Sequence, residues 1–69
     1  MNQPENMIPT RKVFVVSSEF KSHAKVYLVN NPNEADMRII FVEKEEEAEL
    51  KIFLVNFEVL SNYKAYVIL

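Results

Sequence analysis

The sequence has 69 residues, with eight basic and ten acidic side chains and a formal net charge of −2. A chain of this length forms one domain at most, and its core contributes only about 3–5 kcal/mol unless disulfides, a metal or self-association reinforce it. The absence of cysteine excludes disulfides, the single histidine argues against structural zinc, and the interleaved charges lack the positive field that nucleic-acid binding needs.

Residues 1–10 are polar, contain Pro4 and Pro9, and show no periodicity. They are predicted to form an N-terminal arm that precedes a single domain at residues 11–69. The arm has no basic head followed by an apolar run, and no apolar stretch approaches the length of a membrane span. We therefore expect no membrane span. The localisation stays unknown, with the cytoplasm as the default and export by a signal-independent route left open.

From residue 12 onward the sequence repeats every thirteen residues, so that residues of one kind fall in columns. The basic column consists of Lys12, Lys25, Arg38, Lys51 and Lys64. The aromatic column consists of Phe14, Tyr27, Ile40, Phe53 and Tyr66. The small column consists of Ser22, Ala35, Ala48 and Ser61, and the polar column that follows it consists of His23, Asp36, Glu49 and Asn62.

Each repeat contains a run of β-branched and aromatic residues, which is typical of a strand. The predicted strands lie at about residues 12–17, 25–30, 38–43, 51–56 and 64–69. The polar segments between them favour single helical turns. For one turn, Asn31 is a suitable N-cap and Pro32 a suitable first helical residue. The sequence has no glycine, so the turns must form without left-handed glycine corners.

The period of thirteen favours a parallel arrangement, because every repeat of a parallel coil has the same surroundings. We therefore predict a β-rich, solenoid-like parallel sheet. The alternative is an antiparallel meander, for which a period of 26 residues would be natural. Two observations favour the alternative: parallel crossovers usually need a dozen or more residues, and stacked basic side chains would repel one another.

Alternation along the strands separates two faces. The core face is predicted to contain Met37, Ile39, Phe41, Leu50, Ile52 and Leu54. The opposite face is also apolar, with the basic column at its rim. An uncovered aromatic column would exceed what monomers usually expose. Its cover is predicted to be another copy of the protein, or failing that the arm around Met7 and Ile8.

The repeat unit resembles that of a family of short bacterial proteins of unknown function, in which units similar to V-D-Y-x-S-Q-A-D-L-K-V-Y-F recur every thirteen residues. The resemblance covers residues 12–69 and is good at the basic residue, the apolar strand, and the residues Ala35, Asp36, Met37, Ala48 and Leu50. It departs at the family's aspartate and aromatic positions, where only Phe57 keeps aromatic character. The resemblance implies a repeat fold and supplies no catalytic residue.

No arrangement of residues predicts catalysis, a metal site or a cofactor. His23 stands alone, without a nucleophile or an orienting carboxylate in any motif. The glutamates at residues 43–49 lack the spacing of a calcium loop and are interpreted as a solvated turn. The basic column is interpreted chiefly as a partner of the acidic turns.

The predicted function is therefore structural: a self-assembling β-repeat protomer, forming a homo-oligomer and potentially a filament or tube through its sheet face and open strand edges. The predicted interface consists of Phe14, Tyr27, Ile40, Phe53, Tyr66, Val67 and Leu69. The alternative is a small protein-binding module, monomeric or a closed dimer, that uses the aromatic and basic stripe. The partner, the biological role and the symmetry of an assembly are not predicted.

Overall fold

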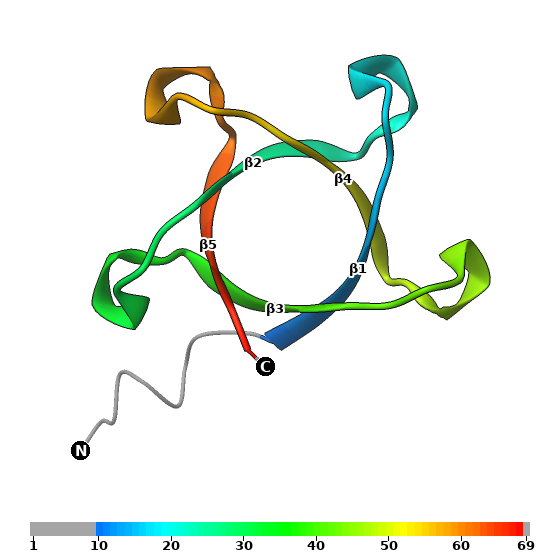
Figure 1. Ribbon diagram of the computed structural model, residues 1–69, viewed down its shortest axis with the longest axis horizontal. Coiled ribbons are helices and arrows are strands. Elements are labelled where there is room, and N and C mark those ends of the chain that lie inside the picture. The colour runs from blue at the N-terminus through cyan, green and yellow to red at the C-terminus, as the bar shows by residue number, and fades with distance from the viewer. Residues whose placement is uncertain (1–9, 69) are drawn as a thin grey trace.

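The structure is a computed structural model that describes residues 10–68, in which five strands alternate with four short 3-10 helices (Figure 1). The elements are β1 (Thr10–Val15), η2 (Glu19–Lys21), β2 (Ala24–Leu28), η3 (Pro32–Glu34), β3 (Met37–Phe41), η4 (Glu45–Glu47), β4 (Leu50–Leu54), η5 (Glu58–Leu60) and β5 (Tyr63–Val67). Each strand begins one or two residues earlier than predicted and ends two residues earlier. The predicted helical turns are confirmed as single 3-10 turns. No helix of residues 10–68 is long and apolar enough to cross a membrane.

The five strands form a closed barrel in the order β1-β3-β5-β2-β4, and all five pairs are parallel. The parallel arrangement predicted from the period is confirmed. The solenoid is wrong, because a solenoid pairs each strand with the next in sequence, and no described strand does so. The antiparallel alternative is wrong as well. Because the sheet closes, the open edge expected at the last strand does not exist among the described residues, and Val67 pairs with Ile39 instead.

The register of the barrel uses only two sequence separations. Thr10 lies opposite Arg38 and Ala24 opposite Ile52, each 28 residues apart, whereas Val13 lies opposite Leu50, 37 residues away. The first separation is two repeats plus two residues, and the second is three repeats less two. Neighbouring strands are therefore staggered by two residues relative to the repeat, in the same direction all the way around the barrel.

This stagger removes the electrostatic objection to a parallel sheet. Members of the basic column do not stack on one another, because each is displaced onto an apolar residue of the adjacent strand. Lys25 lies opposite Phe53, Phe14 opposite Lys51, and Arg38 opposite Tyr66. Like charges are thus kept apart within the ladder.

Each connection between strands is eight residues long and advances the chain by two of the five positions around the barrel. It passes outside the one strand that lies between, so η2 packs against β4, η3 against β5, η4 against β1 and η5 against β2. Figure 1 shows these connections as loops outside the ring of strands. Eight residues suffice because the helical part of each connection is a 3-10 turn of three residues, whereas parallel crossovers of a dozen or more residues usually contain an α-helix.

The core is the barrel interior, which is filled by alternate residues of every strand. Its central layer is fully buried and consists of Val13, Val26, Ile39, Ile52 and Ala65, which are thirteen residues apart. Met37 and Ala24 extend the core toward one end of the barrel, and Leu54 and Val67 pack against it from the other. The predicted core face is therefore confirmed as the interior of the barrel for Met37, Ile39 and Ile52, with Leu50 and Leu54 partly buried, whereas Phe41 is 42% exposed.

The connections need no left-handed residue, since none of the described residues has a positive φ. Asn31 caps η3 as predicted, its side chain accepting a hydrogen bond from the backbone N–H of Asn33 (2.9 Å). The small column supplies the C-caps of the four 3-10 turns and is half-buried. Where it is serine, the hydroxyl also donates to the turn, as Ser22 does to the carbonyl of Glu19 (2.8 Å).

We predict that Ala48→Leu destabilises the protein by about 1–3 kcal/mol, because the half-buried cap of η4 has no room for a larger side chain where η4 packs on β1. Urea unfolding followed by circular dichroism measures the change. The matched control is Ala48→Ser, which reproduces the residue found at two equivalent caps and should unfold like the parent. Equal midpoints for the leucine and serine variants would contradict the close packing of this cap.

Candidate functional site

The polar column fastens each connection to the strand that the connection crosses. After η2 crosses β4, the backbone N–H of His23 donates to the carbonyl of Lys51 (2.7 Å), and the N–H of Lys51 donates back to His23 Nδ1 (2.9 Å). Asp36 makes the same reciprocal pair with Lys64, and Asn62 makes it with Lys25. The side chains differ, but each presents one acceptor atom at the same place.

Glu49 is the exception in the polar column. Its backbone N–H donates to the carbonyl of Lys12 (2.8 Å) as the repeat requires. Its longer side chain reaches instead to Arg11, with 3.5 Å between Oε1 and Nη1. Both side chains are about half exposed, so this ion pair contributes little.

These contacts explain why the single histidine occurs in a turn. Nδ1 of His23 accepts a hydrogen bond from the backbone N–H of Lys51, so the imidazole takes the place that a carboxylate or amide oxygen has in the other repeats. Among residues 10–68, no three histidine, aspartate or glutamate side chains are grouped so that they could hold a metal ion.

The end of the barrel where the strands begin, which we call the amino mouth, contains a depression of about 390 Å³. Ala24, Met37 and Leu50 form its apolar lining, and the remaining lining residues are polar or charged: Arg11, His23, Asp36 and Tyr63. Asp36 and His23 already use one acceptor each to hold the backbone. The amino mouth is thus an apolar floor inside a rim that carries both signs of charge.

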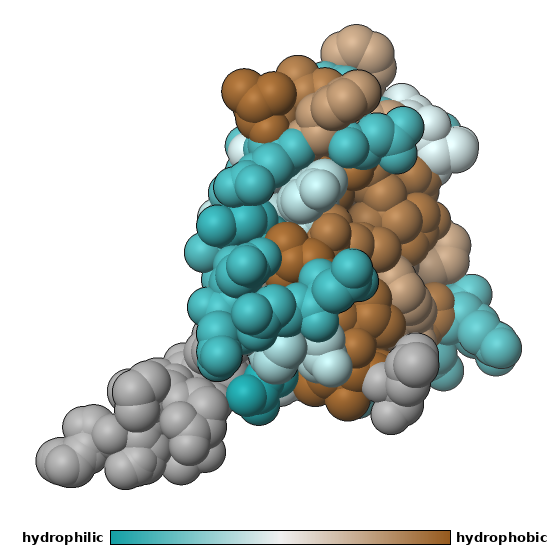
Figure 2. Space-filling view, turned by 60° about the vertical axis from the view of Figure 1, so that its left-hand side comes forward, coloured by the Kyte–Doolittle hydropathy of each residue, from teal (hydrophilic) through white to brown (hydrophobic). Residues whose placement is uncertain are grey.

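The opposite end, which we call the carboxyl mouth, is apolar. It is the last layer of the barrel interior and consists of Val15, Leu28, Phe41, Leu54 and Val67. Three of them remain accessible, with exposed fractions of 41% for Val15, 39% for Leu28 and 42% for Phe41. No charged side chain belongs to this layer. Figure 2 shows apolar surface gathered on one side of the molecule, and hydrophilic residues covering much of the side next to it.

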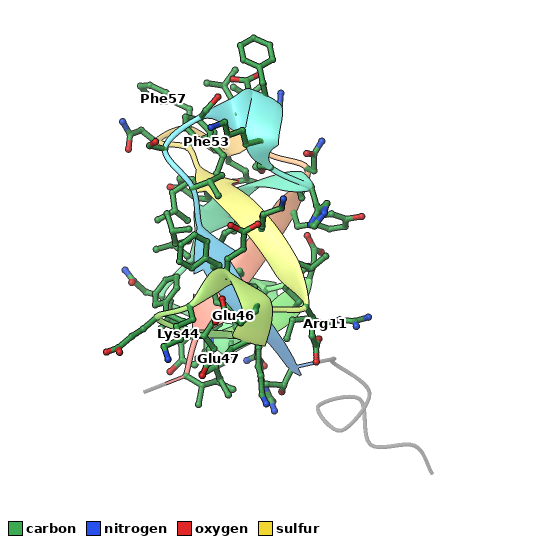
Figure 3. The ribbon with its side chains drawn as sticks, turned by 90° about the vertical axis from the view of Figure 1, so that its right-hand side faces the viewer. Arg11, Lys44, Glu46, Glu47, Phe53 and Phe57 are labelled. Atoms are coloured by element: carbon green, nitrogen blue, oxygen red, sulfur yellow. The ribbon has the colours of Figure 1, made fainter. Side chains whose placement is uncertain are left out.

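The two mouths face in opposite directions. In Figure 3, Arg11 lies toward one end of the barrel, whereas Lys44 and Phe57, which precede η4 and η5, lie toward the other. The asymmetry follows from the repeat. β2, β3, β4 and β5 each start just after a polar-column residue, β1 starts at the polar Thr10, and all five strands end in a large apolar residue. Because the strands are parallel, their polar starts lie together at one end.

The basic column pairs with the acidic turns, as interpreted from the sequence. The Nζ atoms of Lys51 and Lys64 lie 3.2 and 3.5 Å from carboxylate oxygens of Glu45 and Glu58, and Lys25 makes a longer contact with Glu19 (4.0 Å). Each acid belongs to the turn that immediately precedes the strand of its lysine. These side chains are about one-third to three-fifths exposed, so the pairs orient the turns more than they stabilise them.

The predicted interface residues do not form one surface. Phe14, Tyr27, Phe53 and Tyr66 are half-buried on four strands, each of which is crossed by a connection of the same chain. Phe53 lies near η2 in Figure 3. Ile40, on β3, is the one member of the aromatic column that is exposed. Val67 belongs to the carboxyl mouth, and Leu69 lies outside the described residues.

Sequence reasoning missed the carboxyl mouth as a surface. Phe41 and Leu54 are predicted core residues. Both belong to the inward face of their strands, but Phe41 is exposed and Leu54 is only partly buried. The available signal was position: both are the last inward residues of their strands, and a barrel leaves its end layers open unless a lid covers them. It also missed that the polar column is a set of backbone acceptors.

A family model described as the 7(1) septoil knot domain matches residues 2–67 of the sequence. No curated protein and no solved structure matches the chain. The matched span includes every described strand and most of the arm predicted at residues 1–10.

We predict that Asp36→Ala lowers stability by about 0.5–2 kcal/mol, the range for losing a capping acceptor, because the N–H of Lys64 loses its partner. Asp36→Asn keeps an acceptor and should lie close to the parent. Glu49→Ala is the matched control at the same column, and it should cost less because its side chain does not bind the backbone of Lys12. Urea midpoints measure all three. A cost for Glu49→Ala equal to that of Asp36→Ala would refute the acceptor role.

Proposed function

Since the chain belongs to the septoil knot domain family, whose description names a topology and no activity, we propose a structural role for it as a barrel that pairs with a second copy through the carboxyl mouth. We further propose that the bacterial repeat proteins with V-D-Y-x-S-Q-A-D-L-K-V-Y-F-like units are relatives of this chain. The observation that carries the structural role is the ring of accessible, uncharged side chains at the carboxyl mouth.

Contact between two carboxyl mouths removes the apolar surface of these five residues from water, and the glutamates nearest to the mouth, Glu34 and Glu58, line a depression beside Leu28. Each Å² of apolar surface buried contributes about 25 cal/mol. Val15, Leu28 and Phe41 are each about two-fifths exposed, and Leu54 and Val67 add partly buried neighbours. A domain this small has little core of its own, so association is a natural reinforcement.

The polarity of the mouths favours a two-fold pair over a filament. A head-to-tail stack would press Phe41 and Val15 of one copy against Arg11 and Asp36 of the next, and burying those charges without new partners is costly. A head-to-head contact brings like apolar surfaces together. Such an isologous contact closes at two copies, so the proposal is a dimer rather than the filament or tube considered from the sequence.

The mouth of a five-stranded barrel is small compared with the 1,200–2,000 Å² that stable protein interfaces usually bury in total, about 800 Å² on each partner. We therefore expect a weak dimer whose population rises with protein concentration. The pairing would depend mainly on shape and apolar area, because none of the five residues of the carboxyl mouth is charged.

A second function, a protein-binding module, is favoured by the unequal composition of the connections. Phe20 on η2 is 95% exposed and Val59 on η5 is 88% exposed, whereas η3 and η4 carry only proline and polar residues. Phe57 and Leu60 are also exposed beside or within η5. η2 crosses β4, and η5 crosses β2. Because β2 and β4 are neighbours in the barrel, the exposed apolar side chains of η2 and η5 lie over adjacent strands.

We predict that the parent chain shows a monomer–dimer equilibrium in sedimentation velocity over micromolar concentrations, and that Phe41→Lys shifts it to monomer while keeping the β spectrum in circular dichroism. The reason is that a charge placed in the carboxyl mouth of each copy must be desolvated in the pair. Phe20→Lys is the matched control, a charge on an exposed aromatic outside the mouth, and should leave the equilibrium unchanged.

Two results would overturn this proposal. If the parent chain is monomeric at every micromolar concentration tested, the proposed dimer is wrong. If instead Phe20→Lys breaks the dimer and Phe41→Lys does not, the contact lies on the exposed connections, and the binding-module function takes its place.

A further inference from the structure

The amino mouth ends on one layer of the barrel interior, to which every strand contributes. This layer lies two residues before the fully buried central layer in each strand, and its members are Arg11, Ala24, Met37, Leu50 and Tyr63. All five line the depression of about 390 Å³. Ala24 and Met37 are buried, whereas Arg11 and Tyr63 are exposed. The depression is therefore an end layer of the barrel that its own side chains do not fill.

The small side chain of Ala24 makes room for the depression. Following the strand order around the barrel, Ala24 on β2 stands between Tyr63 on β5 and Leu50 on β4. A larger residue at this position would fill the space between its neighbours. The central layer beneath has no accessible surface, so the depression ends inside the barrel and does not pass through it.

The lining separates into a polar sector and an apolar sector. Arg11 belongs to β1 and Tyr63 to β5, and Asp36 immediately precedes β3, which lies between these two strands. The remaining neighbours, β2 and β4, contribute Ala24 and Leu50. A small molecule in the amino mouth therefore meets polar groups on one side and apolar side chains on the other.

The polar sector has hydrogen-bonding capacity that the fold does not use. Asp36 holds the N–H of Lys64 with Oδ2 (2.8 Å), and within residues 10–68 its Oδ1 has no hydrogen bond. The guanidinium of Arg11 carries several N–H donors but has one described contact, 3.5 Å from Glu49. The Arg11 side chain is 49% exposed, so this weak contact leaves it free to turn toward a ligand. His23 completes the rim beside β2, and its Nδ1 is bound to a backbone N–H.

These groups fit a ligand that has a carboxylate, an ammonium group and an apolar side chain. A carboxylate pairs with the planar donors of Arg11, and an ammonium group pairs with Oδ1 of Asp36. A simple anion would face Asp36 and a simple cation would face Arg11, and such like-charge approaches weaken binding. The volume of about 390 Å³ is near the lower end for small-molecule pockets, which hold about 300–1,000 Å³, so it suits a compact ligand.

From these observations we propose that the amino mouth binds a free amino acid with an apolar side chain, such as leucine or phenylalanine. The carboxylate of the ligand lies against Arg11, its ammonium group against Asp36, and its side chain over Ala24 and Leu50. Asp36 keeps its backbone role, because Oδ2 stays on Lys64. The carboxyl mouth takes no part, so the proposal is independent of the dimer.

Titration of the full chain with L-leucine, followed through its amide signals in nuclear magnetic resonance, tests the proposal. We expect saturable shifts at Ala24, Met37 and Tyr63, and none at Phe41 of the carboxyl mouth. N-acetyl-leucine, which lacks the ammonium group, and leucinamide, which lacks the carboxylate, should each bind at least several-fold more weakly. These analogues leave the protein unchanged, so the comparison does not depend on the folding of a variant.

Two variants then assign the charges. Asp36→Asn keeps an acceptor for Lys64 but removes the negative charge, and should weaken the binding of leucine several-fold without weakening that of N-acetyl-leucine. Arg11→Gln should weaken the binding of leucine but not that of leucinamide. The matched control is Glu34→Gln, which also removes one negative charge but lines the depression beside Leu28, and it should bind leucine like the parent.

Three results would overturn the proposal. If neither leucine nor phenylalanine causes saturable shifts at high millimolar concentrations, the amino mouth is not a site for amino acids. Equal binding of leucine and N-acetyl-leucine excludes a role for the ammonium group and identifies a simple anion as the ligand. If Glu34→Gln weakens the binding of leucine as much as Asp36→Asn does, the overall charge of the protein is responsible and the contact with Asp36 is wrong.

Discussion

Closure of this barrel depends on the two-residue offset between the sequence repeat and the strand pairing. Pairing at 28 and 37 residues gives each of the five strand pairs the same two-residue stagger, so that one full turn around the barrel shifts the register by ten residues. The strand count, stagger and tilt of a barrel are linked, so a repeat with another offset would not close at five strands. The offset also puts basic residues beside aromatic ones and brings Val13, Val26, Ile39, Ile52 and Ala65 into one buried layer.

Much of the local structure could be predicted from the sequence, because it depends on neighbours in the chain. Alternation identified Ile39 and Ile52 as core, and Asn31 and Pro32 identified a turn. The pairing partners could not be predicted, because a period of thirteen says that all repeats share one environment without saying which repeat supplies it. A strand that pairs with its sequence neighbour and one that pairs two repeats away produce the same columns. The predicted repulsion between stacked basic residues was the one available sign against direct stacking.

The candidate surfaces were harder to predict for the same reason. Ile40 reads as one more member of an apolar column, and only the winding of the chain shows that its strand is the one on which no connection within residues 10–68 packs closely. His23 reads as a polar turn residue, and its acceptor role becomes visible only when Lys51 of the crossed strand lies beneath it. The sequence shows that the aromatic column needs a cover, but it shows no segment long enough to form a separate covering layer. In the structure, the connections between strands provide this cover as they cross β1, β2, β4 and β5.

The crossings also determine the order in which the molecule can come apart. β1 lies beneath η4, which leads into β4, while β4 lies beneath η2, which leads out of β1. β2 and β5 are enclosed by one another's connections in the same way, through η5 and η3. Neither strand of such a pair can move radially outward before its partner's connection has been lifted. We therefore expect a strand of these pairs to leave the barrel only after a chain end has been withdrawn from beneath the connection that covers it.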